Sequence, residues 1–271
     1  MLGKKQAISH EDWLRAWENI ENLVRKSEID ALVDQTVEEI QKNIKGKKVA
    51  YAWSGGKDSL ALQFVMEQID LFPCFFIRTH LEYPAFLRWV HSHKPRGLTI
   101  IHTGHDLKWL SQNLSMLFPK QGVPDKWDRI ILHQTQDCYY RQNQLDMLIL
   151  GRRKADGNYT GKSPVYTTKK GMTRYNPLRD WKHEHVLGLI HYYQITLPPI
   201  YEWPNGFKVG TGNWAERPYT GSIQQGWREV YTIDPSIVEK AATLIPSARE
   251  FLEKEKQQRS ESHEDTKSSA Q

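Results

Sequence analysis

One segment of the chain, Ser54-Gly55-Gly56-Lys57-Asp58-Ser59, combines the residue types that a phosphate-binding turn requires. Its two glycines allow backbone N–H groups to approach an anion closely, because no Cβ stands in the way. Its lysine adds positive charge, and the serines at its two ends offer hydroxyl groups. The segment therefore predicts an oxyanion-binding turn.

The surrounding sequence predicts that this turn joins a strand to a helix. Residues 47–53 are short, apolar and β-prone, as in a buried strand, and apolar residues recur at helical spacing up to Ile69. The positive end of that helix would point at the bound anion. The turn is not of the Walker A type, because Tyr51 and Asp58 stand where that pattern requires glycine and a hydroxyl residue.

Strands and helices alternate further along the chain. The candidate elements are strands at residues 74–79, 99–103 and 147–150, and helices at residues 84–93 and 106–118. This alternation predicts an α/β fold, a parallel twisted sheet with helices on both faces. Ligands of such sheets bind at the carboxyl ends of the strands. Because Gly151-Arg152-Arg153 follows a strand, we expect it at the same sheet edge as residues 54–59.

We expect four parts along the chain. They are N-terminal helices in residues 1–46, the α/β domain in residues 47–232, a C-terminal helix in residues 233–253 and a disordered tail in residues 254–271. Two capping signals, Ser9 with Asp12 and Ser27 with Asp30, each precede apolar residues at helical spacing and predict the N-terminal helices. The tail is almost wholly polar, which is typical of disorder.

The domain holds three further expected segments. They are a basic loop or hairpin at residues 157–176, a helix at residues 180–193 and an irregular stretch at residues 206–226.

The composition excludes several classes of protein. The 271 residues carry 37 Lys and Arg against 32 Asp and Glu, a net charge of +5 that alone does not demonstrate a nucleic-acid partner. No stretch approaches the ~20 apolar residues of a membrane helix, and the N-terminus has no secretory apolar region. Two cysteines cannot supply a disulfide framework, a four-cysteine zinc site or an iron–sulfur cluster. We therefore expect a cytoplasmic protein with no membrane contact and no iron–sulfur cluster.

The hexapeptide at residues 54–59 resembles the PP-loop, S-G-G-x-D-S, of the Rossmann-like adenine-nucleotide α-hydrolase superfamily. Other segments resemble the phosphoadenosine phosphosulfate (PAPS) reductase branch of that superfamily. They are Ile77–Pro84, Gly151-Arg152-Arg153, Tyr175–Trp181 with His185-Val186, and Leu197-Pro198 with Tyr201. The resemblance implies ATP or a related adenine nucleotide as the ligand. It adds Thr79, Gly151 and Arg179 to the nucleotide- and phosphate-binding residues of the loop.

The chain departs from this branch in its cysteines. Reductases of the branch attack sulfur with a cysteine near the C-terminus, and some hold an iron–sulfur cluster with a Cys-Cys pair and a later C-x-x-C. Here no cysteine follows Cys138, which retains half of the first pair, and Gly210–Trp214 stands where the second pair would fall. Because thiol redox catalysis requires a thiolate, the reductase reaction as known in the branch is not expected.

The principal hypothesis is an ATP pyrophosphatase that cleaves the α–β bond of ATP with Mg²⁺ and adenylates a substrate, in nucleic-acid or sulfur-related modification. Lys57, Arg152 and Arg153 would act in catalysis, because positioned cations stabilise phosphate charge without a protein nucleophile. Asp58 would take part in catalysis by helping to hold Mg²⁺. Two alternatives stay open. One is a sulfonucleotide reductase that uses an external thiol, and the other is a regulatory protein that binds an adenine nucleotide without turnover.

The sequence does not identify the acceptor. The basic stretch at residues 162–174 is compatible with nucleic-acid phosphates, although such stretches are more often solvated loops. Sulfur chemistry would need a partner protein to deliver sulfur, because the chain has no cysteine cluster. The pairs His91/His93 and His183/His185 have no third ligand nearby and do not share a helical face, so we expect no metal there.

Overall fold

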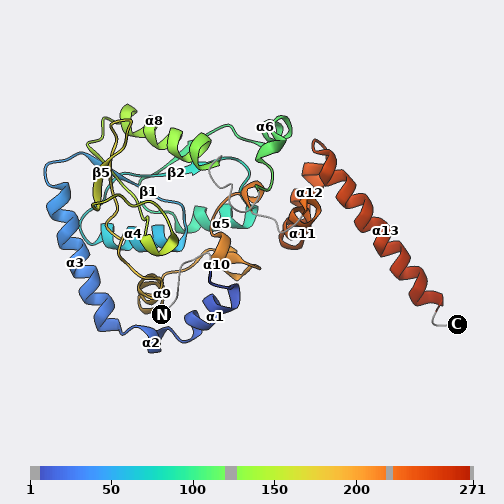
Figure 1. Ribbon diagram of the computed structural model, residues 1–271, viewed down its shortest axis with the longest axis horizontal. Helices are drawn as coiled ribbons and strands as arrows, with labels where there is room; N and C mark the ends of the chain where they lie inside the picture. Colours follow the sequence, from blue (N-terminus) through green and yellow to red (C-terminus); the bar gives the residue numbers. More distant parts are fainter. Residues whose placement is uncertain (1–6, 120–126, 218–221, 269–271) are drawn as a thin grey trace. The chain divides into compact units, whose positions relative to one another are not determined.

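The computed structural model describes residues 7–119, 127–217 and 222–268, and the chain divides into two compact units (Figure 1). The first unit comprises Met1–Arg78, Pro84–His102 and Ile131–Thr211. The second comprises Thr79–Tyr83, Thr103–Ile130 and Gly212–Gln271. All six strands of the sheet belong to the first unit, whereas the described elements of the second unit are helices.

The first unit is built on a six-stranded sheet with the order β3-β2-β1-β4-β6-β5. The strands are β1 (Val49–Ala52), β2 (Cys74–Arg78), β3 (Leu98–His102), β4 (Met147–Ile149), β5 (Val165–Thr167) and β6 (Thr173–Tyr175). All neighbours pair in parallel except β5, which is antiparallel to β6. The predicted α/β fold with a mostly parallel sheet is therefore confirmed. The central strand β1 ends two residues before the glycine pair, so the turn leaves the sheet at its carboxyl edge.

Helices cover both faces of this sheet (Figure 1). One face carries α3 (Lys26–Ile44), α4 (Lys57–Glu67), α5 (Pro84–His93) and α9 (His183–Tyr192), and α3, α4 and α9 contact one another. The other face carries α8 (Gln134–Gln142), whose Tyr139 ring lies 4.2 Å from the ring of Phe75 on β2. The core under α8 also contains Leu148, Leu150 and Met172. The sheet therefore separates the α4 face from the α8 face.

The N-terminal helices α1 (His10–Glu18), α2 (Ile20–Leu23) and α3 pack within the first unit. The predicted capping box is confirmed, because the amide of Asp12 donates to the Ser9 side chain and the Asp12 carboxylate accepts from the Ser9 amide. The second predicted cap is wrong. The helix begins at Lys26, so Ser27 lies inside its first turn, and Asp30 instead accepts from the ammonium of Lys26 at 2.8 Å.

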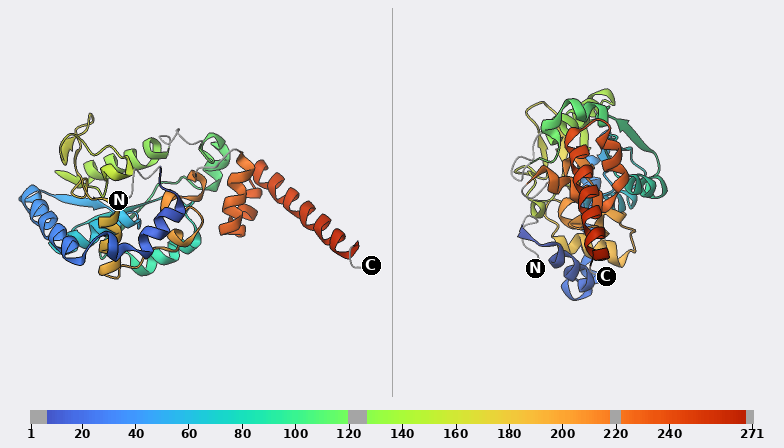
Figure 2. Two further views of the ribbon diagram at one scale, coloured as in Figure 1. Left: turned by 60° about the horizontal axis from the view of Figure 1, so that its bottom comes forward. Right: turned by 90° about the vertical axis from the view of Figure 1, so that its right-hand side faces the viewer.

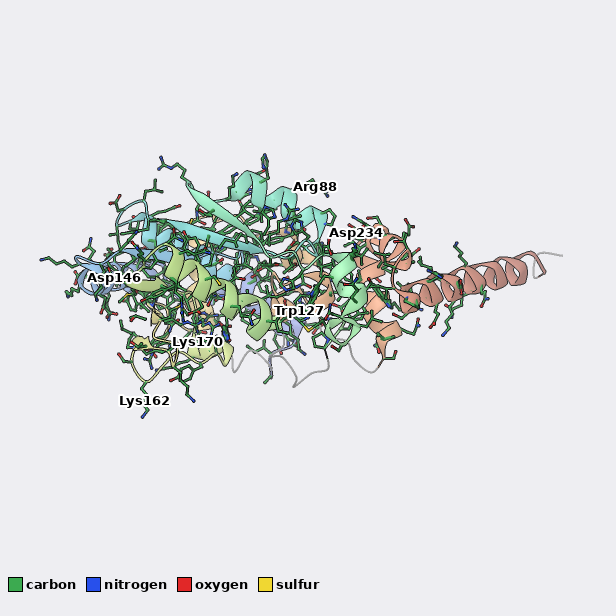
Figure 3. The ribbon with its side chains drawn as sticks, turned by 90° about the horizontal axis from the view of Figure 1, so that it is seen from above. Arg88, Trp127, Asp146, Lys162, Lys170 and Asp234 are labelled. Atoms are coloured by element: carbon green, nitrogen blue, oxygen red, sulfur yellow. The ribbon has the colours of Figure 1, made fainter. Side chains whose placement is uncertain are left out.

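The basic segment forms the hairpin of β5 and β6, which turns at Gly171 with a φ of 86°. Lys162 and Lys170 are exposed, and the Lys162 side chain points away from the body of the unit (Figure 3). The hairpin adds its two strands to the sheet beside β4, with Leu148 paired to Arg174. The predicted hairpin is thus present, and it places one arginine of the basic stretch inside the fold.

The second unit contains α6 (Leu107–Gln112), α11 (Ile223–Ile233), α12 (Pro235–Ala242) and α13 (Pro246–Ser268). In its core, Trp227 packs against Phe118, with ring centroids 4.9 Å apart, and against Trp214, with ring centroids 5.8 Å apart. The amide of Phe118 donates to the carbonyl of Ala215 at 2.8 Å. This core joins Phe118 to α11, which in turn contacts α12 and α13.

The tail differs from its expectation. Residues 254–268 continue α13 as one helix, which Figure 2 shows without a break, whereas the sequence predicted disorder from residue 254. Residues 269–271 lie outside the described ranges. Polarity argues against a buried core, but Glu, Lys, Gln and Arg are good helix formers, so a polar tail can still be helical. The stretch at residues 206–226, predicted to be irregular, also holds α10 (Gly206–Val209) and the start of α11.

None of the helices in the described ranges is both long enough and apolar enough to cross a membrane.

Candidate functional site

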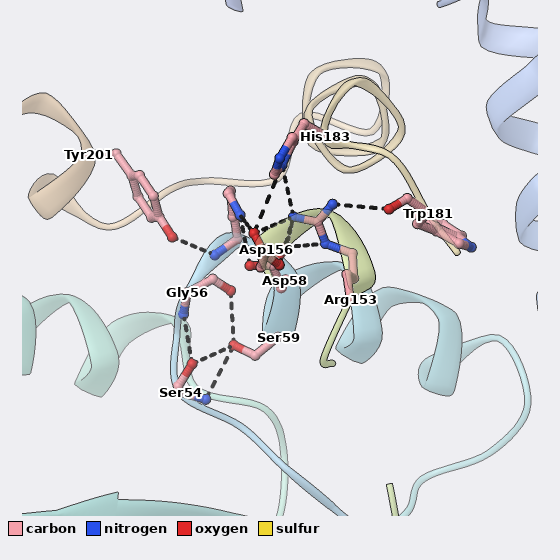
Figure 4. A network of polar contacts seen from close by, with 10 residues as sticks. Ser54, Gly56, Asp58, Ser59, Arg153, Asp156, Trp181, His183 and Tyr201 are labelled. Carbon is pink, nitrogen blue, oxygen red and sulfur yellow. Dashed lines mark hydrogen bonds and ion pairs between the residues drawn. The ribbon is translucent and has the colours of Figure 1, made fainter. Parts of the chain in front are cut away.

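The turn between β1 and α4 is fixed by its own hydroxyl groups. The Ser59 hydroxyl donates to the carbonyl of Gly56 at 2.9 Å and accepts from the amide of Ser54 at 3.2 Å (Figure 4). Gly55 has a φ of 70°, which favours glycine, and a Cβ there would lie 3.1 Å from the rings of Phe86 and Trp89. The serines therefore shape the turn, and Gly55 is required by both its backbone and its neighbours.

Gly56 faces a second segment of the same unit. A Cβ on Gly56 would lie 3.1 Å from the hydroxyl oxygen of Thr211 and 3.4 Å from that of Tyr201. The backbone amide of Lys57 donates to the Tyr201 hydroxyl at 2.7 Å. The first amide of α4 is therefore bonded to a tyrosine, and the hydroxyl groups of Thr211 and Tyr201 lie close to the bare Cα of Gly56.

A cavity of about 150 Å³ opens between these two segments. One wall is the turn, with Ser54 and Gly56–Ser59, and the other holds Tyr201, Phe207 and Val209–Thr211. Burial raises the pKa of the Tyr201 phenol, so this group stays protonated. Because its oxygen accepts from the Lys57 amide, its own hydrogen is available to a group in the cavity.

Lys57 is a buried cation at the floor of this site, with 2% of its surface exposed. Its ammonium lies 2.7 Å from a carboxylate oxygen of Asp58 and 3.7 Å from one of Asp156. It also lies 5.5 Å from the centroid of the Trp13 ring, which α1 supplies. These contacts keep the ammonium charged and fixed in place although it is removed from water.

Arg153 joins the same network from the turn after β4 and is fully buried (Figure 4). Its Nε donates to Asp58 at 2.7 Å, and its Nη2 lies 3.0 Å from Asp156. Its Nη1 donates to the carbonyl of Trp181 at 3.1 Å. Gly151 lets the turn after β4 approach the start of α4, because a Cβ at this position would lie 2.9 Å from the backbone oxygen of Asp58. Two cations and two carboxylates thus balance each other beneath the turn.

His183 completes the network as a neutral group. Burial, together with the positive charges of Arg153 and Lys57, lowers its pKa to about 4. Its Nδ1 lies 3.3 Å from Nη2 of Arg153 and accepts from it, so the proton of the neutral ring is on Nε2. The ring also packs edge-on against Trp13, with centroids 4.6 Å apart. Among the described residues, no group of three or more His, Cys, Asp or Glu side chains could hold a metal ion.

The structure brings most of the predicted site residues together. These are Ser54, Gly55, Gly56, Lys57, Asp58, Ser59, Gly151 and Arg153. Arg152 instead lies on the α8 side of the sheet, with its Nη2 3.2 Å from Nε2 of His133. Within the described residues, Arg179 has its charged contact with Asp180, at 3.4 Å, and none with the turn. Thr79 belongs to the second unit, where its hydroxyl donates to Glu82 at 2.8 Å.

The sequence did not assign four members of the site: Trp13, Asp156, His183 and Tyr201. Tyr201 was recognisable as part of the family pattern, although its bond to the turn was not. Asp156 follows Arg153 by three residues, a spacing with no signature of its own. Trp13 and His183 reach the network only through tertiary packing, which sequence patterns do not reveal.

The phosphoadenosine phosphosulfate reductase domain matches residues 48–208, which is more than half of the chain. The chain therefore belongs to the phosphoadenosine phosphosulfate reductase domain family, and its fold is of the PP-loop type. A search of curated proteins finds no match.

Solved structures agree with this fold. The chain is similar to phosphoadenylyl-sulfate reductase from Candida auris in a phosphate complex, with a TM-score of 0.50 and 15% identity over 70% of this chain and 96% of that one. It is also similar to NH3-dependent NAD synthetase from Campylobacter jejuni in complex with nitrate, with a TM-score of 0.45 and 15% identity over 80% of this chain and 93% of that one. A third similar structure is NAD+ synthetase from Burkholderia pseudomallei, with a TM-score of 0.46 and 13% identity over 93% of this chain and 98% of that one. At these identities the similarity to the reductase shows the fold alone.

The two cysteines lie away from the cavity wall. Cys74 is buried on β2, where burial raises the pKa of its thiol, and Cys138 is exposed on α8. Thr211 contributes a hydroxyl to the cavity in the segment where the cluster-binding branch carries its second cysteine pair. A buried thiol with a raised pKa is a poor nucleophile, because the thiolate is the reactive form.

Proposed function

We propose that the chain binds ATP at the turn of residues 54–59 and cleaves its α–β phosphate bond, so that an acceptor is adenylated and pyrophosphate is released. The observation that carries this proposal is the cavity in which Gly56, Lys57 and Ser59 face Tyr201 and Thr211. Amides of a helix N-terminus, a buried ammonium and a phenolic hydroxyl are groups that bind phosphate oxygens.

The reaction needs positioning more than it needs a protein nucleophile. An oxygen of the acceptor would attack the α-phosphorus in line with the leaving pyrophosphate, and the enzyme would stabilise the charge on the phosphate oxygens. Lys57 is held at the cavity by Asp58 and Asp156, so its charge is in place before the nucleotide arrives. Arg153 supports the site indirectly, because it fixes the Asp58 carboxylate.

The residues present are compatible with Mg²⁺. Asp58 lines the cavity with a quarter of its side chain exposed, and magnesium commonly binds one or two carboxylates together with phosphate oxygens and water. When bound, the ion would neutralise part of the phosphate charge. Asp58 would be its protein ligand, while the bond from Arg153 keeps this carboxylate oriented.

A sulfonucleotide reductase that uses an external thiol is the second candidate, and family membership favours it. In that case the same cavity would bind the phosphosulfate group, and the reducing thiol would come from another molecule, because the chain places neither of its cysteines on the cavity wall. The two candidates differ in the product, which is pyrophosphate for the first and sulfite for the second.

The test is incubation of the full chain with Mg²⁺ and ATP labelled at the α-phosphate, with tRNA, DNA or small acids as acceptors. The expected result is pyrophosphate release with transfer of label to one acceptor class. Lys57→Ala should abolish both, whereas Lys154→Ala should leave both intact, because Lys154 is exposed and pairs with Asp180 at the surface. Sulfite formation from phosphoadenosine phosphosulfate with a thiol donor, without pyrophosphate release from ATP, would replace this function by the reductase.

A further inference from the structure

A second arginine, Arg174 on β6, is buried without a carboxylate. Only 6% of its surface is exposed, its Nη2 donates to the side-chain oxygen of Gln136 at 3.1 Å, and its Nε is enclosed without a hydrogen-bond partner. Across residues 7–119, 127–217 and 222–268, no acidic side chain forms an ion pair with it. A guanidinium group stays charged when buried, so this position calls for an anion that the described part of the chain does not provide.

Arg174 lies on the α8 face of the sheet, opposite the face that carries α4. It pairs in register with Leu148 of β4, which belongs to the core under α8, and Gln136 is itself a residue of α8. Tyr166 lies opposite Arg174 on the antiparallel strand β5, and its buried hydroxyl also has no partner. Two donors of neighbouring strands are thus enclosed without acceptors, which is rare for buried polar groups.

Arg152 approaches the same helix from the carboxyl end of β4. Its Nη2 lies 3.2 Å from Nε2 of His133, the residue directly before α8. His133 and Gln136 are three positions apart and therefore share one helix face. Arg152 and Arg174 thus reach the same side of α8 from adjacent strands, with the half-buried Arg152 nearer the sheet edge and Arg174 behind it.

The adjacent residues Arg152 and Arg153 separate at this point. Arg153 goes to the α4 face, where Asp58 and Asp156 neutralise it, and Arg152 goes to the α8 face. The nearest acid on α8 in sequence is Asp137, one residue after Gln136, and it pairs with the exposed Arg141 at 3.3 Å. Arg152 and Arg174 therefore place two cationic side chains on the α8 face, near the edge where parallel sheets bind ligands.

We infer that Arg174 and Arg152, with His133, form a second anion-binding site that takes a phosphate or sulfate group at the α8 face. Guanidinium groups bind such oxyanions through two parallel N–H groups, and the enclosed Nε of Arg174 supplies one of them. The site lies apart from the turn at residues 54–59 and needs no cleavage of ATP. Its anion comes either from a second anionic group on the bound nucleotide or from a separate phosphorylated or sulfated molecule.

The test is a titration of the full chain with inorganic phosphate, followed through the arginine Nε–H signals by NMR. The Arg174 signal is assigned by its loss in Arg174→Lys, and it should shift in a saturable way. In Arg174→Met, where the Arg152 Nε–H signal reports on the site instead, binding should weaken by about tenfold or more, since a charge-assisted hydrogen bond is lost. Arg141→Met is the matched control, because it removes an exposed arginine of α8, and this variant should bind phosphate as the wild type does.

A second arm identifies the source of the anion. If the nucleotide supplies it, adenosine 3′,5′-bisphosphate should bind more tightly than AMP, and Arg174→Met should remove that advantage. If another molecule supplies it, phosphate should still shift the Arg174 signal when AMP is saturating.

The same titration in Gly56→Ala separates this site from the turn, because that substitution adds a methyl group at the turn, 3.1 Å from the Thr211 hydroxyl oxygen, and leaves Arg174 unchanged. Persistence of the Arg174 shift there supports the second site whatever becomes of the proposed ATP chemistry. An Arg174 signal that does not respond to phosphate, or equal phosphate binding by Arg174→Met and the wild type, would overturn the inference.

Discussion

Two buried arginines, one on each face of the sheet, show opposite ways of accommodating a charge. Arg153 is fully enclosed and contacts two carboxylates and a carbonyl, so the chain itself satisfies it. Arg174 is almost as deeply buried, and among the residues that the structure describes its polar side-chain contact is with the amide oxygen of Gln136. The first arginine therefore belongs to the structure of the site, and the second has the environment of a residue that binds a ligand.

Residues that look alike in the sequence have different roles in the structure. Arg152 and Arg153 are neighbours in one turn, yet of these two it is Arg153 that holds Asp58 beneath the turn of residues 54–59. In the proposed function, Lys57 faces the nucleotide, and Arg153 is a positioning residue that acts through the carboxylate of Asp58.

The largest expected effect is on stability. Arg153→Met should lower the free energy of unfolding by about 3–5 kcal/mol, because it leaves buried carboxylates of Asp58 and Asp156 with fewer partners. Arg174→Met should change it by less than about 1 kcal/mol, because no carboxylate loses its partner there. Urea unfolding at neutral pH measures both. Equal destabilisation by the two substitutions would contradict the distinction between the arginines.

A smaller effect should appear in the pH dependence of stability. The folded-state pKa of His183, about 4, lies below its unfolded value of about 6.5, so the unfolded chain binds the additional proton. The contribution of neutral His183 is therefore complete above pH ~6.5 and is lost as the pH falls towards 4, by about 3 kcal/mol in total.

His183→Asn provides the comparison for that prediction, because carboxylates titrate in both proteins and cancel in the difference. The unfolding free energies of variant and wild type should differ by an amount that shrinks as the pH falls from about 6.5 to 4. A constant difference across this range would show that His183 does not titrate as its surroundings require.

The smallest effect concerns Tyr201. Tyr201→Phe removes the acceptor of the Lys57 amide and should cost about 1 kcal/mol of stability, the usual contribution of one hydrogen bond. ATP affinity should fall by a factor of roughly 5–10 if the hydroxyl also donates to phosphate. Calorimetric binding with the wild type as reference checks this, and unchanged affinity would remove Tyr201 from the nucleotide site.

The sequence was sufficient for the sheet and for the turn. β-prone runs ending at glycine-rich turns predicted β1 and β4, and the strand-to-helix alternation predicted that both turns share one edge. The sequence could not show that α1 supplies Trp13 to the ammonium of Lys57, because that contact spans 44 positions and depends on packing. It also could not separate Arg152 from Arg153, whose side chains differ only in the face of the sheet that they reach.

Helix ends were less predictable than strands. Ser9 and Ser27 offered the same capping signal, yet only Ser9 caps a helix, because α3 begins one residue before Ser27. The helix α13 continues through a tail whose polarity suggested disorder. A polar sequence indicates that a segment has no buried core, but its residues can still have a high propensity for helix.

The most direct test of the central claim is ATP binding by Gly56→Ala. The φ of Gly56, −75°, is accessible to alanine, so the new methyl group changes the space beside Thr211 and Tyr201 without backbone strain. ATP affinity should fall by at least about tenfold while the melting temperature stays near that of the wild type. Wild-type affinity in Gly56→Ala would contradict a phosphate site at this turn.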